Sequence, residues 1–457
     1  MPTASGAVAV RQWYTLSVDD RRTGYAYTEH ASEPGGTIER EFVRIDVRQP
    51  WQTSHLERRI DVHRGEDGAA ATVVFDAQAG VAHTAWRATR IGERLRVIEH
   101  DSTHEREQFI DLPAATLVAS DRTRDLSALW QHQVDHWVRP VFDARRRAVV
   151  MTSATMVEDN EHERIHVRVV RDDSPEDGRE DIWFGADGSI ERIEAPLFGS
   201  TVAWTVCAKD CDAAVTEPVD PMDRFVVRSP VAIPLQLKHR TIRYVLTRSD
   251  AERPTVAATA EQQSVFDGSR AIVTVCPDCG IDERPGNEEL RLYLAPNRWV
   301  RSDDADVRNA ALSAAPRAMR VDLRMRKLVH EVERRMHGGN DFLGYGDALT
   351  ALRTGSGDCT EFAVLLAAFA RAQGIPARVV FGLAYSERFS GRKNVFSPHV
   401  WVQAWDGKRW SSYDAALDEF DSTHIALAIG SGTPDDYARL IAGLPKLRIE
   451  NAGVLRK

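Results

Sequence analysis

The chain has 457 residues, more than one hydrophobic core usually organises, so two or three domains are expected. Its net charge of -9, spread without a basic cluster, excludes nucleic acid as the main partner. No run approaches the roughly 18 apolar residues of a transmembrane segment, and residues 1–30 lack the apolar core of a secretory signal. By this criterion a cytoplasmic location is the default expectation.

Residues 1–220 are expected to form a β-rich N-terminal domain built of antiparallel sheet. Apolar and polar residues alternate in "EFVRIDV" (41–47) and in "ERIHVRVV" (163–170), as in strands with one buried face. The turn residues "GADGS" at 185–189 predict a hairpin between two such strands. One helix is expected over about 122–138, where apolar residues recur at helical spacing.

A cluster of four prolines in "TEPVDPMDRFVVRSPVAIP" (216–234) predicts a domain boundary. Residues 221–300 are expected to form a short β segment or linker domain. The pattern turns helical near residue 303 and returns to strands after Gly374, which predicts an α+β core over residues 301–440. Residues 441–457 are expected to form a C-terminal tail.

Within this core, the stretch "TGSGDCTEFA" places a lone cysteine, Cys359, just after residues that favour a helix N-cap. The apolar run that follows predicts a buried helix ending at Gly374. Unpaired amides and the positive end of the helix dipole would lower the pKa of a thiol in the first turn and prepare it for attack. The alternative is a small core residue, because free cysteines are among the most buried residues.

A base and an orienting acid for this thiol are available downstream. His399 opens an alternating strand in "SPHVWVQAWDGKRWSSYDAA", the dipeptide "DG" turns the chain, and Asp414 ends the next strand. Hairpin pairing would bring the imidazole and the carboxylate side by side. Taken singly, each would be read as an ordinary histidine or an ordinary acid at a strand end.

The order of cysteine, histidine and aspartate is that of a papain-like core, and at this point the chain resembles a family. The segments "GDCTEFAVLLAAFARAQGIPARVV", "HVWVQAW" and "WSSYDAALDEFDSTHI" resemble the bacterial branch of the transglutaminase-like superfamily. The resemblance covers about residues 320–430. It implies Cys359 as nucleophile, His399 as base and acid, and Asp414 as the group that orients His399. His424, within "DSTHI", also matches this branch but is read as a structural strand residue without a role.

The β-rich N-terminal region before the core is similar, in its succession of predicted hairpins, to the curved sheets of lipoprotein carriers. Animal transglutaminases use calcium, but no loop here has the spacing of a calcium site, so no cofactor is expected for catalysis. The family resemblance suggests a periplasmic or secreted location, in contrast to the default reading of the N-terminus.

Four further cysteines form two close pairs, Cys207 with Cys211 and Cys276 with Cys279. Their spacing fits a structural zinc site of four thiolates, two disulfides, or plain reduced thiols. The resemblance, through the oxidising compartment it suggests, favours disulfides, and zinc remains the alternative.

The expected function is therefore acyl transfer or hydrolysis on amide or peptide substrates, through a thioester on Cys359. A protein or peptide substrate is the expected partner. One alternative is a cysteine peptidase or amidase that uses the same three residues. Another is a binding or scaffold protein whose transglutaminase-like core has no activity. The oligomeric state is left open.

Overall fold

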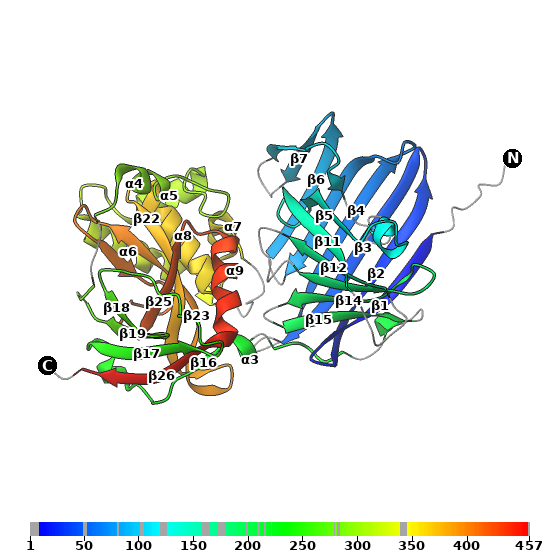
Figure 1. Cartoon of the computed structure of the whole chain (residues 1–457). Coiled ribbons are helices and arrows are strands. Elements are labelled where there is room, and N and C mark those ends of the chain that lie inside the picture. The colour runs from blue at the N-terminus through cyan, green and yellow to red at the C-terminus, as the bar shows by residue number, and fades with distance from the viewer. Residues whose placement is uncertain are drawn as a thin grey trace. The chain divides into compact units, whose positions relative to one another are not determined.

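The computed structural model of the chain (Figure 1) describes residues 9–48, 53–79, 82–100, 105–118, 126–157, 165–171, 179–197, 200–207, 211–213, 216–220, 222–277, 279–280, 284–338 and 345–455. The chain divides into two compact units, the first ending at Asp220. The proline cluster of residues 216–234 lies at this division. The structure is α+β in character. None of the described helices is long and apolar enough to cross a membrane.

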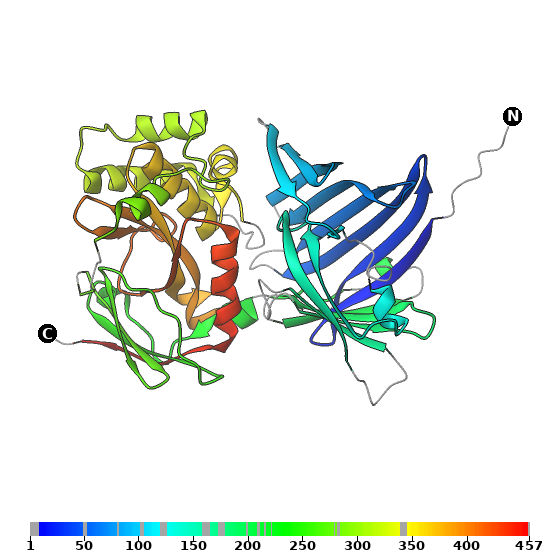
Figure 2. The ribbon, with the colours of Figure 1, turned by 45° about the horizontal axis from the view of Figure 1, so that its top comes forward.

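The first unit is one 15-stranded sheet in the order β8-β7-β6-β5-β4-β3-β2-β1-β15-β14-β13-β12-β11-β10-β9. Neighbouring strands are antiparallel, except that β9 and β10 are parallel. Figure 2 shows this sheet curling strongly on itself. The strands are β1 Val10–Val18, β2 Arg21–Glu33, β3 Gly36–Arg48, β4 Thr53–Gly65, β5 Ala70–Ala79, β6 Ala82–Ile91, β7 Arg94–His100, β8 Glu105–Asp111, β9 Leu117–Val118, β10 His136–Asp143, β11 Ala148–Val157, β12 Ile165–Arg171, β13 Glu180–Phe184, β14 Ile190–Leu197 and β15 Ser200–Cys207.

The predicted alternation is confirmed in β3, where Val43, Ile45 and Val47 are buried between partly exposed neighbours. The predicted hairpin at 185–189 is confirmed by the antiparallel pairing of β13 with β14.

The helix predicted over about 122–138 is wrong beyond one turn. Only α2 (Ser127–Trp130) is helical, β10 already begins at His136, and residues 122–125 lie outside the described residues. Pairing with β11 along the whole of β10 overrides the local helical spacing, because the sheet supplies the hydrogen bonds and the packing.

The curled sheet encloses a cavity of about 210 Å³ whose wall is mainly apolar, with Trp137 and Trp204 among its residues. Three ion pairs also line it, so the charges of these side chains balance: Arg58 with Glu41 at 2.7 Å, Arg171 with Glu180 at 2.9 Å, and Arg145 with Asp143 at 3.7 Å.

The second unit combines two antiparallel sheets with a group of helices. One sheet has the order β16-β23-β22-β25, with β24 paired to β23, and the other has the order β18-β19-β17-β26. Helices α5, α6 and α7 pack around α8, which in turn packs on β22 and β23 (Figure 1). The elements are α3 Met222–Phe225, β16 Val227–Arg228, β17 Ile242–Arg248, β18 Gln262–Asp267, β19 Arg270–Val275, α4 Asn287–Leu292, α5 Ala305–Ala314, α6 Val321–Arg335, β20 His337–Gly338, α7 Ala348–Thr354, β21 Ser356–Gly357, α8 Cys359–Ala372, β22 Ala377–Phe389, β23 Arg392–Trp405, β24 Trp410–Tyr413, β25 His424–Gly430, α9 Pro434–Gly443 and β26 Leu447–Val454, with short 3-10 turns at Cys211–Ala213 in the first unit and at Leu235–Leu237 and Leu444–Lys446 in the second.

Residues 221–300 and 441–457, expected as a linker domain and a tail, belong instead to this second unit. The reason is strand pairing: β17 lies between β19 and β26, so the segment before the core and the end of the described chain share one sheet. The two-residue strand β16 also pairs with β23 in the other sheet.

Candidate active site

Cys359 occupies the first position of α8, where a capping box fixes the helix start. The Asp358 carboxylate accepts hydrogen bonds from the Thr360 backbone N–H and hydroxyl, both at 2.7 Å. The Glu361 carboxylate reaches back to the Asp358 N–H at 2.9 Å. A Cβ at Gly357 would lie 2.4 Å from the Glu361 Cβ, so only glycine fits there. The predicted N-cap is therefore confirmed, and the cysteine backbone is held in place.

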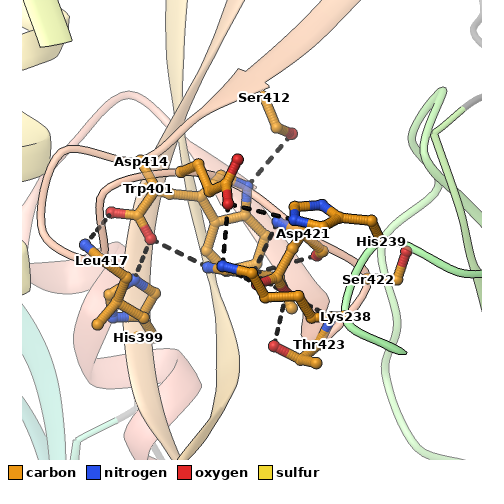
Figure 3. Close-up of polar contacts among 12 residues, drawn as sticks. Lys238, His239, His399, Trp401, Ser412, Asp414, Leu417, Asp421, Ser422 and Thr423 are labelled. Carbon is orange, nitrogen blue, oxygen red and sulfur yellow. Dashed lines mark hydrogen bonds and ion pairs between the residues drawn. The ribbon is translucent and has the colours of Figure 1, made fainter. Parts of the chain in front are cut away.

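The histidine lies on β23 and the aspartate directly follows β24, its hairpin partner. The pairing of Trp405 with Trp410 closes the predicted hairpin. His399 Nε2 lies 2.6 Å from Asp414 Oδ2, and both side chains are buried (Figure 3). The other carboxylate oxygen of Asp414 accepts the backbone N–H groups of Ala416 at 2.8 Å and Leu417 at 3.2 Å.

The cysteine and the histidine meet at one cavity of about 260 Å³. The backbone N–H of Val400, the residue next to His399, acts on the thiol and lowers its pKa. The three residues predicted from the sequence are thus brought to one place, with the thiol and the imidazole on a shared cavity wall and the carboxylate behind the imidazole. The lining residues are Met222, Gly338, Gly357, Asp358, Cys359, Phe362, Ser386, Phe389, Ser397, Pro398, His399, Ala416, Leu417 and Tyr437.

The pKa of the Cys359 thiol differs from the expectation. Burial, followed by the charges of Asp358 and Glu361, raises the pKa of Cys359 well above its usual value, and the Val400 hydrogen bond lowers it by less. The expectation that the helix start would lower this pKa is wrong for the free site. The two capping acids that fix the helix also lie beside the sulfur, and together with burial they oppose its ionisation.

Residues 313–415 match the family model of the transglutaminase-like superfamily, and this span contains Cys359, His399 and Asp414. The chain carries a transglutaminase-like domain. No curated protein matches the chain significantly by sequence.

Solved structures align with parts of the chain at low identity and low TM-score. A candidate cysteine protease from Cytophaga hutchinsonii is 17% identical, covers 48% of this chain and 85% of its own, and has a TM-score of 0.30. The periplasmic domain of TgpA from Pseudomonas aeruginosa is 17% identical over 49% of this chain and 79% of its own, with a TM-score of 0.30. A β-barrel-like protein of the domain of unknown function DUF1849 from Brucella abortus is 14% identical over 45% of this chain and 98% of its own, with a TM-score of 0.35.

Beyond the matched span, the transglutaminase-like domain holds a second histidine against Asp414. His424, the first residue of β25, places Nε2 3.0 Å from Asp414 Oδ2, the same oxygen that His399 contacts. Its Nδ1 lies 3.1 Å from the Asp421 carbonyl oxygen and 3.4 Å from the Asp421 carboxylate. The sequence analysis gave His424 no role. A histidine at the start of an apolar strand was the available signal, because such a position is buried and needs polar partners.

Residues before the matched span brace the strands that carry these groups. The Glu261 carboxylate accepts the Ser412 N–H at 2.8 Å and the Gln403 amide at 3.0 Å. The neighbouring Gln262 side chain exchanges two hydrogen bonds of 2.8 Å with the backbone of Ala426. One segment therefore ties together β23, β24 and β25, the strands that position His399, Asp414 and His424. Sequence periodicity carried no signal for this long-range bracing.

The donor atoms of His399, Asp414 and His424 lie within 4.8 Å of one another, as in a metal site. The separations of 2.6 and 3.0 Å are those of direct hydrogen bonds. Two ligands on one zinc ion, each at about 2.1 Å, would lie more than about 3 Å apart. The arrangement therefore fits a proton-sharing cluster better than a metal centre.

The four paired cysteines form two local disulfides, Cys207–Cys211 in the first unit and Cys276–Cys279 in the second. In this state each sulfur is bonded to its neighbour, so none of the four is a thiolate that can bind zinc. Cys359 is the free cysteine.

Peptide mapping without reductant tests this pairing. We expect two linked peptides that contain Cys207–Cys211 and Cys276–Cys279, and one alkylated thiol, Cys359, in the denatured chain. After reduction all five cysteines should be alkylated. Stoichiometric zinc together with four alkylated thiols before reduction would instead support the metal site.

Proposed function

We propose that this protein is a cysteine enzyme that transfers or hydrolyses the acyl group of amide or peptide substrates through a thioester on Cys359. The observation that carries the proposal is the shared cavity of the Cys359 thiol and His399, with His399 held from behind by the buried Asp414. A nucleophile, a base and an orienting carboxylate in this order are the parts that acyl transfer needs.

The hydrogen bonds of the His399 imidazole determine which of its nitrogens transfers protons. Because Nε2 of His399 is engaged by Asp414, Nδ1 is the nitrogen that exchanges a proton with the substrate side. In the first step the thiol proton passes to Nδ1 while sulfur bonds to the carbonyl carbon. The C–N bond then breaks, and the same proton leaves on the departing amine. The Cys359 backbone N–H, which has no intrahelical carbonyl to bond, is the candidate donor for the oxyanion.

The second half regenerates the thiol. Water or a second amine gives a proton to His399 and attacks the thioester carbon, after which the C–S bond breaks and sulfur recovers a proton from His399. Since the raised pKa of Cys359 disfavours a resting thiolate, we propose that proton transfer accompanies attack in each turnover instead of preceding it. Water gives hydrolysis and an amine gives a cross-link.

The cavity favours an uncharged acyl group. Its apolar wall includes Met222, Phe362, Phe389 and Leu417, and Asp358 is the carboxylic acid among its described lining residues. Burying a charged side chain there without a partner would be costly.

An assay of primary amides tests both the reaction and this preference. We expect ammonia release from acetyl-phenylalanine amide with kcat/KM at least about tenfold higher than from acetyl-glutamate amide. Glutamine-containing peptides, followed by ammonia release and by backbone cleavage, separate side-chain deamidation and transamidation from peptidase activity. Intact mass after a rapid acid quench should show an acyl adduct, and the adduct should be absent in Cys359→Ala. Absence of adduct and turnover with all of these substrates would contradict the proposal.

A non-catalytic scaffold is the second candidate, and the raised pKa of Cys359 favours it, because a protonated thiol is a weak nucleophile. Unchanged cellular function in a Cys359→Ser variant would support the scaffold.

For location, we propose an oxidising compartment, periplasmic or secreted. The two disulfides support this, since such bonds persist where thiols are not kept reduced.

A further inference from the structure

His424 lies outside the span that matches the family, yet it is built into the candidate site. It is 2% exposed, and both of its ring nitrogens face acidic residues, Asp414 on one side and Asp421 on the other. Buried histidines are usually neutral and need one donor and one acceptor partner. At Nδ1 the Asp421 carbonyl oxygen, at 3.1 Å, is closer than the Asp421 backbone N–H, at 3.3 Å. With the Asp414 carboxylate 3.0 Å from Nε2, these acceptors suit a ring that is protonated on both nitrogens.

The contact with Asp414 is made at the oxygen that His399 uses. Oδ2 receives both imidazoles, at 2.6 and 3.0 Å, while Oδ1 receives the backbone N–H groups of Ala416 and Leu417. The carboxylate therefore cannot rotate without breaking several hydrogen bonds at once. His424 therefore helps to fix the rotation of Asp414 at the same oxygen that His399 contacts.

Charge alternates along the chain of contacts beyond His424. Asp421 is also held by the Thr423 N–H at 2.7 Å, and its other oxygen lies 3.8 Å from Lys238 Nζ (Figure 3). The order is His399, Asp414, His424, Asp421 and Lys238. The remaining faces of His424 meet the rings of Trp401 at 5.3 Å and Phe420 at 5.0 Å, which carry no charge.

We propose that His424 is a cationic positioning residue that keeps Asp414 ionised and aligned behind His399. The inference rests on the proposed acyl transfer. With His424 charged, the negative charge of Asp414 is already balanced before turnover. When His399 accepts the thiol proton, its imidazolium meets a carboxylate that is shared with a second cation, so the proton passes readily to the leaving amine.

The electrostatics around His424 agree with this geometry. Burial alone would lower the pKa of His424, but hydrogen bonds and charge from Asp414 and Asp421 raise it to about 9. The ionisable groups that face it are the His399 ring, whose centroid lies 5.4 Å from its own, the carboxylates of Asp414 and Asp421, and, through Asp421, Lys238, which also pairs with Glu419. The charge of Asp414 also contributes to raising the pKa of the Cys359 thiol.

The kinetic test is His424→Gln, because glutamine can keep a hydrogen bond to Asp414 but not the charge. We expect kcat to fall about tenfold or more with KM changed less than about twofold, the pattern of a residue that acts on the transition state. Wild type should show a change in kcat/KM near pH 9, and the variant should lack it. His83→Gln is the matched control, since this exposed histidine pairs with Asp76 in the first unit and takes no part in this chain of contacts. Retention of the inflection in His424→Gln would overturn the proposal.

A substrate-free measurement separates this inference from the proposed function. In ¹⁵N-histidine NMR spectra we expect His424 as an imidazolium at pH 7.5, titrating near pH 9, and a shifted His399 Nε2 signal in His424→Gln. Lys238→Met removes the outer cation beside Asp421 and should therefore shift the His424 titration to higher pH, if the wild-type fold is kept. A neutral His424 ring at pH 7.5, or an unmoved His399 signal, would overturn the proposal even if the enzyme is active. If no amide is turned over, the proposed function fails and these spectra alone decide the charge and the positioning.

Discussion

Cys359→Ser is expected to lower kcat/KM for amide substrates by about 10⁴-fold or more, because it removes the nucleophile while keeping nearly the same shape. A serine hydroxyl is far less acidic than a thiol. The surroundings that raise the pKa of Cys359, namely burial and the carboxylates of Asp358 and Glu361, act on a hydroxyl in the same direction. His399 would then have to remove a proton that is held much more tightly, and the alkoxide would form in a site with negative charge at its edge.

The comparison needs a variant that disturbs the same cavity without touching the chemistry. Ser386→Ala serves, because Ser386 lines the cavity on β22 and has no role in the proton transfers. We expect Ser386→Ala to keep activity within about threefold and Cys359→Ser to keep the wild-type melting temperature, since the substitution is nearly isosteric. If Cys359→Ser retains more than about a tenth of wild-type activity, the thioester is not on the reaction path.

Local signals predicted the parts of the site that are local. The capping residues around Cys359 predicted a helix start. The "DG" dipeptide with its flanking strands predicted the hairpin that joins His399 to Asp414. These features depend on residues a few positions apart, so their geometry can be predicted from short sequence patterns.

The features that the sequence did not reveal depend on contacts between distant segments. His424 meets Asp414 only because β25 pairs with β22, and Glu261 reaches Ser412 across a separation of 151 residues. The thiol pKa was misjudged for a related reason. Burial is the largest cause of the raised pKa, and the acids that make a good helix cap add to it because they lie beside the sulfur, so the helix dipole alone predicts the wrong direction.

The same holds for the domain plan. The prolines at 216–234 mark the point where the two units divide, but no pattern within residues 221–300 indicates that β17 pairs with β26 near the end of the chain. The sequence of one strand says little about which distant strand it pairs with, because many strands share the same alternation of apolar and polar residues.

Asp414→Asn is expected to cost both activity and stability. A neutral amide can no longer balance the buried His424 cation or stabilise the imidazolium of His399. We expect kcat to fall about 10³- to 10⁴-fold. We also expect the free energy of unfolding to fall by about 3–5 kcal/mol, the range for a buried ion pair that loses one partner. Urea unfolding and amide turnover measure the two effects, with Asp303→Asn, at an exposed aspartate, as the matched control.

The difference in the free energy of unfolding between wild type and Asp414→Asn should depend on pH if the carboxylate charge matters, and should be constant if only packing matters. The pairing with His399 and His424 holds the pKa of Asp414 far below its usual 3.8, so its stabilisation is present above about pH 4 and is lost on acidification. His424 has a pKa raised from 6.5 to about 9, so its contribution is complete below about pH 6.5 and is lost as the pH rises through 9. The difference between wild type and Asp414→Asn should therefore be widest between about pH 4 and 6.5 and should narrow on both sides. A difference that is constant from pH 3 to pH 10 would mean that Asp414 contributes packing alone, and the charge-sharing cluster behind His399 would have to be abandoned.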